Sequence, residues 1–157
     1  MSDDSLVFMM GKFEATFPTD RQYAKNHTWA SRVQISHGQQ GYRFGFTAYA
    51  VRLLQDVYFL EWSVDAPTNL RQGQEIGFIE SSKAESDLYA PLAGQLTTLN
   101  PALLSDPSQI NLDMYGAGWL YEIDGPGDEL MSPEEYLTHL AGVWEITQRT
   151  IKGQLNE

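Results

Sequence analysis

The chain has 157 residues, 42% of them hydrophobic and 12% aromatic, which is enough for one domain with its own core. It contains no cysteine, so disulfide scaffolds, thiolate metal sites and cysteine nucleophiles are excluded. Twenty-one acidic and ten basic side chains give a formal net charge of -11, which repels phosphate backbones, so we expect no nucleic-acid partner.

The first 22 residues are predicted to form a loosely attached N-terminal arm, with one edge strand in the apolar patch from Leu6 to Met10. The acidic start, Met1 to Ser5, has no basic n-region and does not resemble a secretory signal. No apolar run in the chain reaches the roughly 18–20 residues of a membrane span. We therefore expect a cytoplasmic protein of a prokaryote, with no membrane contact.

Residues 23–131 are predicted to form one mainly β domain. Alternating or short apolar runs predict strands over 29–36, 42–46, 57–62, 76–80, 86–91, 95–99 and 119–123, with a turn at 37–41 and a polar loop at 63–74. Thr47 is expected to cap a short helix over 48–54, and Asn100 a helical turn that begins at Pro101.

Residues 132–157 are predicted to form a C-terminal amphipathic helix packed on the domain. Ser132-Pro133-Glu134-Glu135 is a capping box, and apolar residues at helical spacing follow it for about 18 residues. Many short strands, brief helices and one terminal helix are typical of a small β-sandwich or barrel-sandwich.

Lysine is scarce, and one lysine stands apart. Of four lysines, only Lys83 falls between Asn26 and Ile151, in a span suited to a hairpin turn. The carboxylates Glu80, Glu85 and Asp87 surround it. This arrangement has two interpretations: a solvated turn whose ion pairs contribute about 0–1 kcal/mol each, or an exposed amine that a modifying enzyme can reach.

Residues 80–94 favour the second interpretation. They read Glu-Ser-Ser-Lys-Ala-Glu-Ser-Asp-Leu-Tyr-Ala-Pro-Leu-Ala-Gly and closely resemble the lipoylation hairpin of the glycine cleavage system H protein family. The resemblance covers about residues 23–142 and includes His27-Thr28-Trp29, Gly45-Phe46-Thr47, Asp56-Val57, Asn100-Pro101, Ile110-Asn111, Gly118-Trp119 and Met131 to Tyr136.

The resemblance implies a barrel-sandwich hybrid fold and lipoic acid attached to Lys83 by an amide bond. It also implies a carrier rather than an enzyme. The arm takes an aminomethyl group from glycine decarboxylase to aminomethyltransferase, and dihydrolipoyl dehydrogenase reoxidises it. A lipoylating enzyme is expected to contact Glu80. The cofactor would supply the sulfurs that a cysteine-free chain lacks. Biotin is the rival modification on this fold, but Ser82 and Ala84 replace the methionines that flank a biotinyl lysine.

The chain departs from the family pattern at three places. Thr28 stands where the family has a glutamate near the cleft that shelters the loaded arm, while Asp87 is kept and could serve instead. Gln55 replaces a glycine, and both ends of the chain are extended. His27 either bonds the arm or supports a loop. No pair of histidines has metal-ligand spacing, so no metal site is predicted.

Two alternatives to a glycine cleavage carrier remain. One is an H-like paralogue whose lipoyl arm serves lipoate relay or sulfur transfer, which the threonine at position 28 favours. The other is an unmodified interaction module, against which the intact surroundings of Lys83 argue.

Overall fold

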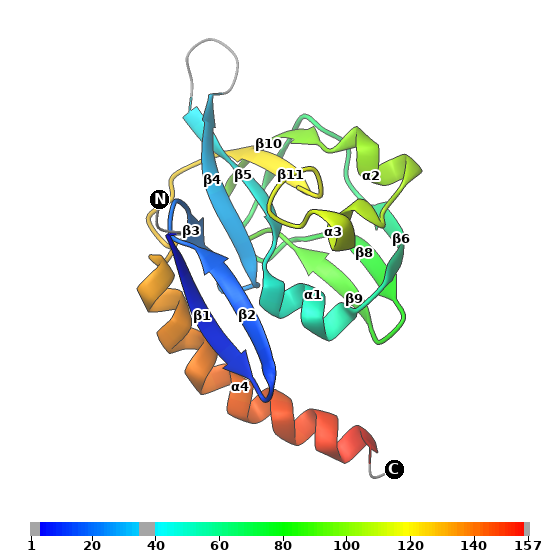
Figure 1. Cartoon of the computed structure of the whole chain (residues 1–157). Helices are drawn as coiled ribbons and strands as arrows, with labels where there is room; N and C mark the ends of the chain where they lie inside the picture. The colour runs from blue at the N-terminus through cyan, green and yellow to red at the C-terminus, as the bar shows by residue number, and fades with distance from the viewer. Residues whose placement is uncertain (1–3, 35–39, 156–157) are drawn as a thin grey trace.

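Short antiparallel strands are the main regular structure of the molecule, a computed structural model that describes residues 4–34 and 40–155 (Figure 1). The strands are β1 Ser5–Met10, β2 Phe13–Pro18, β3 Gln22–Tyr23, β4 Thr28–Gln34, β5 Gln40–Phe46, β6 Val57–Trp62, β7 Thr68–Leu70, β8 Glu75–Ser81, β9 Glu85–Tyr89, β10 Gly94–Leu99 and β11 Tyr121–Asp124. They form a six-stranded sheet in the order β3-β4-β5-β11-β10-β7, a three-stranded sheet β6-β8-β9, and the pair β1-β2.

The main hydrophobic core is shared by the two larger sheets. Phe44, Leu96 and Ile123 of the six-stranded sheet are fully buried in one cluster with Ile76 and Ile79 of the three-stranded sheet. Burial of each such side chain contributes roughly 1.5–3 kcal/mol. Two open sheets that pack on one core, with helices at the margins, confirm the predicted mainly β, barrel-sandwich class.

Three of the four helices in the described residues begin at the predicted caps. The four are α1 Ala48–Leu54, α2 Pro101–Ser105, α3 Gln109–Leu112 and α4 Pro133–Leu155, of which α3 was not predicted. The Thr47 hydroxyl accepts a hydrogen bond from the Ala50 N–H (3.4 Å), and the Asn100 side chain accepts one from the Ala102 N–H (3.1 Å). These bonds satisfy N–H groups that have no partner within the helix.

The capping box at the start of α4 is also confirmed. The Glu135 N–H donates to the Ser132 hydroxyl (3.1 Å), and the Ser132 N–H donates to the Glu135 carboxylate (2.8 Å). The helix is 23 residues long, several more than expected. None of the helices in the described part of the chain combines the length and the apolar character needed to cross a membrane.

Residues 5–18 differ most from the prediction, because they form a packed hairpin rather than a loosely attached arm. β1 and β2 pair along their whole length, and Ala15 and Phe17 are fully buried together with Tyr136 and Leu140 of α4. The alternation of apolar and polar residues from 13 to 17 is the strand signal that the prediction missed. Gly11, with φ of +65°, supplies the tight turn.

A second difference lies in the predicted polar loop at 63–74. Thr68–Leu70 forms β7, which pairs with β10 at the edge of the six-stranded sheet. Three residues are too few to show a strand period in the sequence. The predicted turn at 37–41 falls partly outside the described residues. The domain boundaries after residues 22 and 131 stay predictions.

Candidate functional site

Lys83 lies exposed at the tip of the β8-β9 hairpin, and the turn beneath it is closed by one serine. Ser81 is buried; its hydroxyl donates to the Ala84 carbonyl (2.9 Å) and accepts from the Ala84 N–H (3.1 Å). The backbone N–H of Ser81 also donates to the Ala84 carbonyl (2.9 Å). The turn is therefore rigidly closed while the lysine ammonium points to solvent.

The hairpin tip is also tied to the segment before β6. The Ser82 N–H donates to the Asp56 carbonyl (2.9 Å), and the Asp56 N–H donates to the Ser82 hydroxyl (3.1 Å). Asn111 of α3 holds the same segment from the other side: its carbonyl accepts from the Val57 N–H (2.9 Å), and its amide donates to the Gln55 carbonyl (2.5 Å). These bonds fix the position of the tip relative to the body of the protein.

Gln55, the residue that replaces the family's glycine, has an unusual backbone conformation. Its φ is +61° and its ψ is -134°, a combination that glycine adopts freely and other residues adopt at a cost of about 1–3 kcal/mol. Its side-chain amide donates to the Arg52 carbonyl, which offsets part of this cost. The departure therefore preserves the local shape that a glycine would give.

Two carboxylates face each other at the base of the tip. Glu80 on β8 pairs directly with Glu85 on β9, so the two side chains lie on the same face of the hairpin. Like charges directly opposite one another destabilise a strand pair. An acidic pair next to an exposed lysine costs stability and gives the tip a negative surface that a partner protein can recognise.

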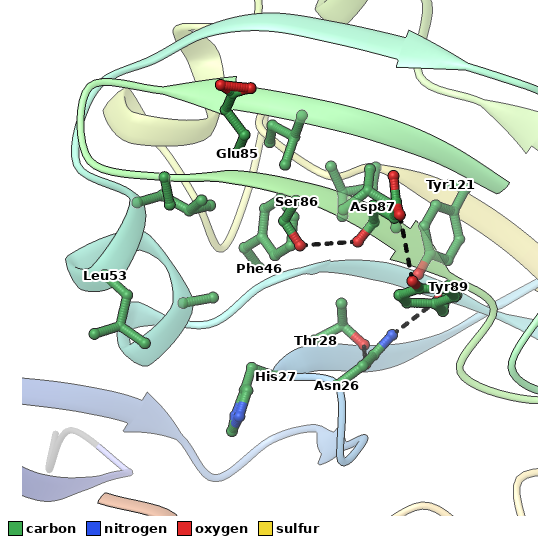
Figure 2. A pocket seen from close by; sticks show the side chains of 16 residues that line it. Asn26, His27, Thr28, Phe46, Leu53, Glu85, Ser86, Asp87, Tyr89 and Tyr121 are labelled. Atoms are coloured by element: carbon green, nitrogen blue, oxygen red, sulfur yellow. Dashed lines mark hydrogen bonds between the residues drawn. The ribbon is translucent and has the colours of Figure 1, made fainter. Parts of the chain in front are cut away.

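A cavity of about 410 Å³ opens beside this hairpin (Figure 2). Its apolar wall comes from four elements and includes Phe46, Leu53, Leu54, Ile79 and Leu88. The remaining hairpin residues from Ala84 to Tyr89 also line the cavity. A cavity of this size and lining suits a flexible aliphatic chain.

Polar groups connect the two sides of the cavity. The Thr28 hydroxyl donates to the Asn26 side-chain carbonyl (2.6 Å), and the Asn26 amide donates to the Tyr89 backbone carbonyl (3.1 Å). The Tyr89 hydroxyl in turn donates to the Asp87 carboxylate (3.4 Å), whose negative charge raises the pKa of Tyr89. Thr28 is buried and Asp87 is exposed, so this chain of bonds runs from the interior to the mouth.

The cavity wall includes a buried phenol. Tyr121, on the cavity wall, is fully buried, and this burial raises the pKa of its phenol well above the ordinary value. Water is a poor competitor for polar groups in such a place.

His27 borders the cavity, but its ring is turned toward α4 (Figure 2). Its Nδ1 is 2.9 Å from the Tyr136 hydroxyl, which also lies 3.0 Å from the Thr47 hydroxyl, and the ring packs against Tyr49 with centroids 4.6 Å apart. Burial, the larger cause, and the nearby His139 together lower the pKa of His27 to about 4. These contacts are those of a supporting residue.

The structure thus separates the predicted residues into two groups. Lys83 and Glu80 lie at the tip of the hairpin, whereas His27, Thr28 and Asp87 border the cavity. No group of three or more histidine, aspartate or glutamate side chains in the described ranges is placed to hold a metal ion.

Sequence reasoning missed Asn26 and Tyr89, which complete the polar connection, and the bracing role of Ser81. Asn26 precedes a residue with positive φ and has no pattern of its own. Tyr89 has one visible signal: it lies two residues after Asp87, and residues at that spacing share one face of a strand.

Comparisons with known proteins identify the family of the chain. The family model described as "Glycine cleavage H-protein" matches residues 21–143. The glycine cleavage system H protein of Corynebacterium jeikeium is 37% identical over 120 residues, which are 76% of this chain and 93% of that protein. The glycine cleavage system H protein of Mycolicibacterium gilvum is 37% identical over 131 residues, which are 79% of this chain and 96% of that protein. The crystal structure of a glycine cleavage system H protein from Mycobacterium marinum has a TM-score of 0.69 and 34% identity, and covers 80% of this chain and 99% of that one. The chain belongs to the glycine cleavage H-protein family.

Proposed function

We propose that this protein is a lipoyl carrier of the glycine cleavage system and that lipoic acid is joined to the Lys83 amine by an amide bond. The observation that carries the proposal is the placement of this exposed lysine on a braced hairpin tip beside a cavity of about 410 Å³. Bracing presents the amine in a constant frame to each enzyme that must reach it.

The residues present fit a lipoyl group. Phe46, Leu53 and Leu88 would contact its aliphatic chain, and Thr28 and Asp87 supply polar groups for its far end. When attached, the group supplies the sulfur that carries an aminomethyl group, a chemistry that the cysteine-free chain lacks. The chain's own part is to hold the arm, to limit its contact with water and to offer it again.

This role needs partners rather than a catalytic centre. The expected partners are glycine decarboxylase, aminomethyltransferase, dihydrolipoyl dehydrogenase and the lipoylating enzyme, and we assign no catalytic residue to the chain. A tethered arm has a high effective concentration at each partner that binds the domain. We place the carrier in the cytoplasm, where it would diffuse between these enzymes.

Thr28 supports a second candidate function. Its hydroxyl is already bonded to Asn26, and a hydroxyl cannot pair with a cationic aminomethyl nitrogen as a carboxylate does. An H-like carrier for lipoate relay or sulfur transfer would not need that carboxylate. Loading by purified glycine decarboxylase separates the two: a glycine cleavage carrier accepts the group, whereas a relay carrier stays unloaded.

Attachment is tested by intact mass of the natively expressed protein and by peptide mapping. We expect one lipoyl group, on Lys83, and none after Lys83→Arg, with the melting temperature nearly unchanged because the side chain is exposed. Lys12→Arg is a matched control, since Lys12 is also exposed in a hairpin turn but does not lie in the serine-braced turn beside the cavity described above. A native protein without the group would favour an unmodified interaction module, and a biotinyl mass would identify the rival cofactor.

Recognition by the lipoylating enzyme is tested at the acidic pair. Glu80→Gln should slow modification of Lys83 more than Glu85→Gln does. Both changes remove the same repulsion between opposite residues, so their effects on stability should be alike. Equal rates of modification would leave Glu80 without a particular role.

A further inference from the structure

β1 presents an open sheet edge at the outside of the N-terminal hairpin. The opposite edge, along β2, faces the body of the protein: the Tyr115 hydroxyl donates to the Thr16 carbonyl (2.7 Å) and accepts from the Ala48 N–H (2.9 Å). No other described element hydrogen-bonds to the outer edge of β1. α4 runs alongside β1 (Figure 1), and Phe8 and Met10 pack into the cluster that it shares.

The register identifies which backbone groups face outward. The Thr19 N–H donates to the Asp4 carbonyl (2.8 Å), so in the antiparallel ladder the even-numbered residues of β1 bond to β2. Ser5 therefore belongs to a pair without hydrogen bonds, as its partner Pro18 requires. The N–H and C=O groups of Ser5, Val7 and Met9 point away from β2.

This edge lacks the features by which proteins normally block strand addition. Its six residues, Ser-Leu-Val-Phe-Met-Met, include no charge and no proline, and the pairing with β2 has no bulge. Val7 and Met9 are also 45% and 50% exposed. The other sheet edges in the described part are short, charged or bulged: β3 has two residues, β7 has three, β9 contains Glu85 and Asp87, and β6 contains Glu61 and a register shift.

We propose that β1 pairs with β1 of a second copy of this chain, antiparallel about a twofold axis at Val7, so that the two hairpins form one four-stranded sheet. In this register Val7 lies opposite Val7, and Ser5 lies opposite Met9. Ser5, Val7 and Met9 then each form two backbone hydrogen bonds with the residue opposite in the second copy.

Charge favours a second copy as the occupant. Each β1 has Asp4 directly before it and Lys12 in the turn after it. Antiparallel pairing about Val7 brings Asp4 of one copy opposite Met10 of the other, two residues from that copy's Lys12. The paired strands themselves carry no charge, so the interface avoids the repulsion expected between two chains of net charge -11. The whole hairpin precedes residue 21, where the match to the family model begins.

The mass of the full chain in solution, measured by sedimentation, is the first test. We expect twice the chain mass of 17.7 kDa for the wild type. Val7→Pro removes an outward N–H and leaves the bonds between β1 and β2, and should give a monomer. Val7→Ala shortens the same side chain but keeps the N–H, and should stay dimeric. A monomeric wild type, or a dimer that Val7→Pro does not dissociate, would overturn the proposal.

Cross-linking tests the register, because the chain has no cysteine of its own. Val7→Cys places two sulfurs opposite each other across the twofold axis and should give a disulfide-linked dimer under mild oxidation. Met9→Cys is similarly exposed, but its two copies would lie four residues apart along the strands, roughly 13 Å, beyond the ~7 Å Cα separation that a disulfide tolerates. It should cross-link at least tenfold more slowly. Equal rates for the two variants would contradict this interface.

Discussion

The partly buried ring of His27 makes the protein sensitive to acid in a defined pH range. The unfolded chain takes up a proton on this ring near pH 6.5, whereas the folded chain does so only near pH 4. The contribution of His27 to the free energy of unfolding is therefore fully present above pH 6.5 and is lost as the pH falls toward 4. The two pKa values differ by about 2.5 pH units, and the free energy of unfolding falls by at most about 1.4 kcal/mol for each unit. The loss down to pH 4 is therefore about 3 kcal/mol.

The groups around the ring explain the direction. Tyr49 of α1 and Tyr136 of α4 pack against it, and His139 of α4 lies with its ring centroid 5.9 Å away. Burial is the larger cause of the lowered pKa, and the charge of a protonated His139 adds to it. A proton on His27 would thus lie among the rings of Tyr49, Tyr136 and His139.

Urea unfolding between pH 7 and pH 4 measures the effect against His27→Asn. Asparagine tolerates the φ of +66° at this position and does not titrate, so carboxyl groups contribute equally to both proteins. The stability advantage of the wild type should shrink by about 3 kcal/mol over this range. His139→Gln should reduce the loss. If wild type and His27→Asn lose stability in parallel, the ring is not held neutral by its surroundings.

Three further predictions concern the hairpin and the cavity. Gln55→Gly should raise the free energy of unfolding by about 1 kcal/mol in urea titrations, because it relieves the positive φ, whereas Gln55→Ala should not. Asn111→Ala should lower the free energy of unfolding by about 2 kcal/mol in the same assay, because it removes two hydrogen bonds to the segment before β6. A loss under ~0.5 kcal/mol would show that this segment keeps its conformation without those two bonds. Thr28→Glu should slow loss of the aminomethyl group from the arm without the transferase, and Asp87→Asn should speed it, each by about tenfold for one charge-assisted hydrogen bond; unchanged lifetimes would favour the paralogue.

Local signals predicted the parts of the fold that depend on few neighbouring residues. Thr47 and Asn100 cap helices where expected, and Ser132 with Glu135 forms the predicted box, because capping needs only a side chain and the next turn. The length of α4 was underestimated, because its last part lies beyond the strongest apolar repeat.

Features that depend on distant contacts were not predictable from the sequence. β7 is defined by its pairing with β10, some 25 residues further along the chain. Asn26 acts through Tyr89, 63 residues away, and Asn111 through the backbone at Val57, 54 residues away. The family motif located Lys83, but only the structure shows the cavity beside it.

The segments outside the family match support the cavity through α1. The match spans residues 21–143, so the β1-β2 hairpin precedes it and α4 extends beyond it. Both pack into one cluster with Tyr49 of α1, and Phe13 lies 4.3 Å beneath the Arg52 guanidinium on the same helix. Leu53 borders this cluster on one side and the cavity on the other. α1 is thus a wall common to both, and the hairpin stabilises the wall against which the arm would rest.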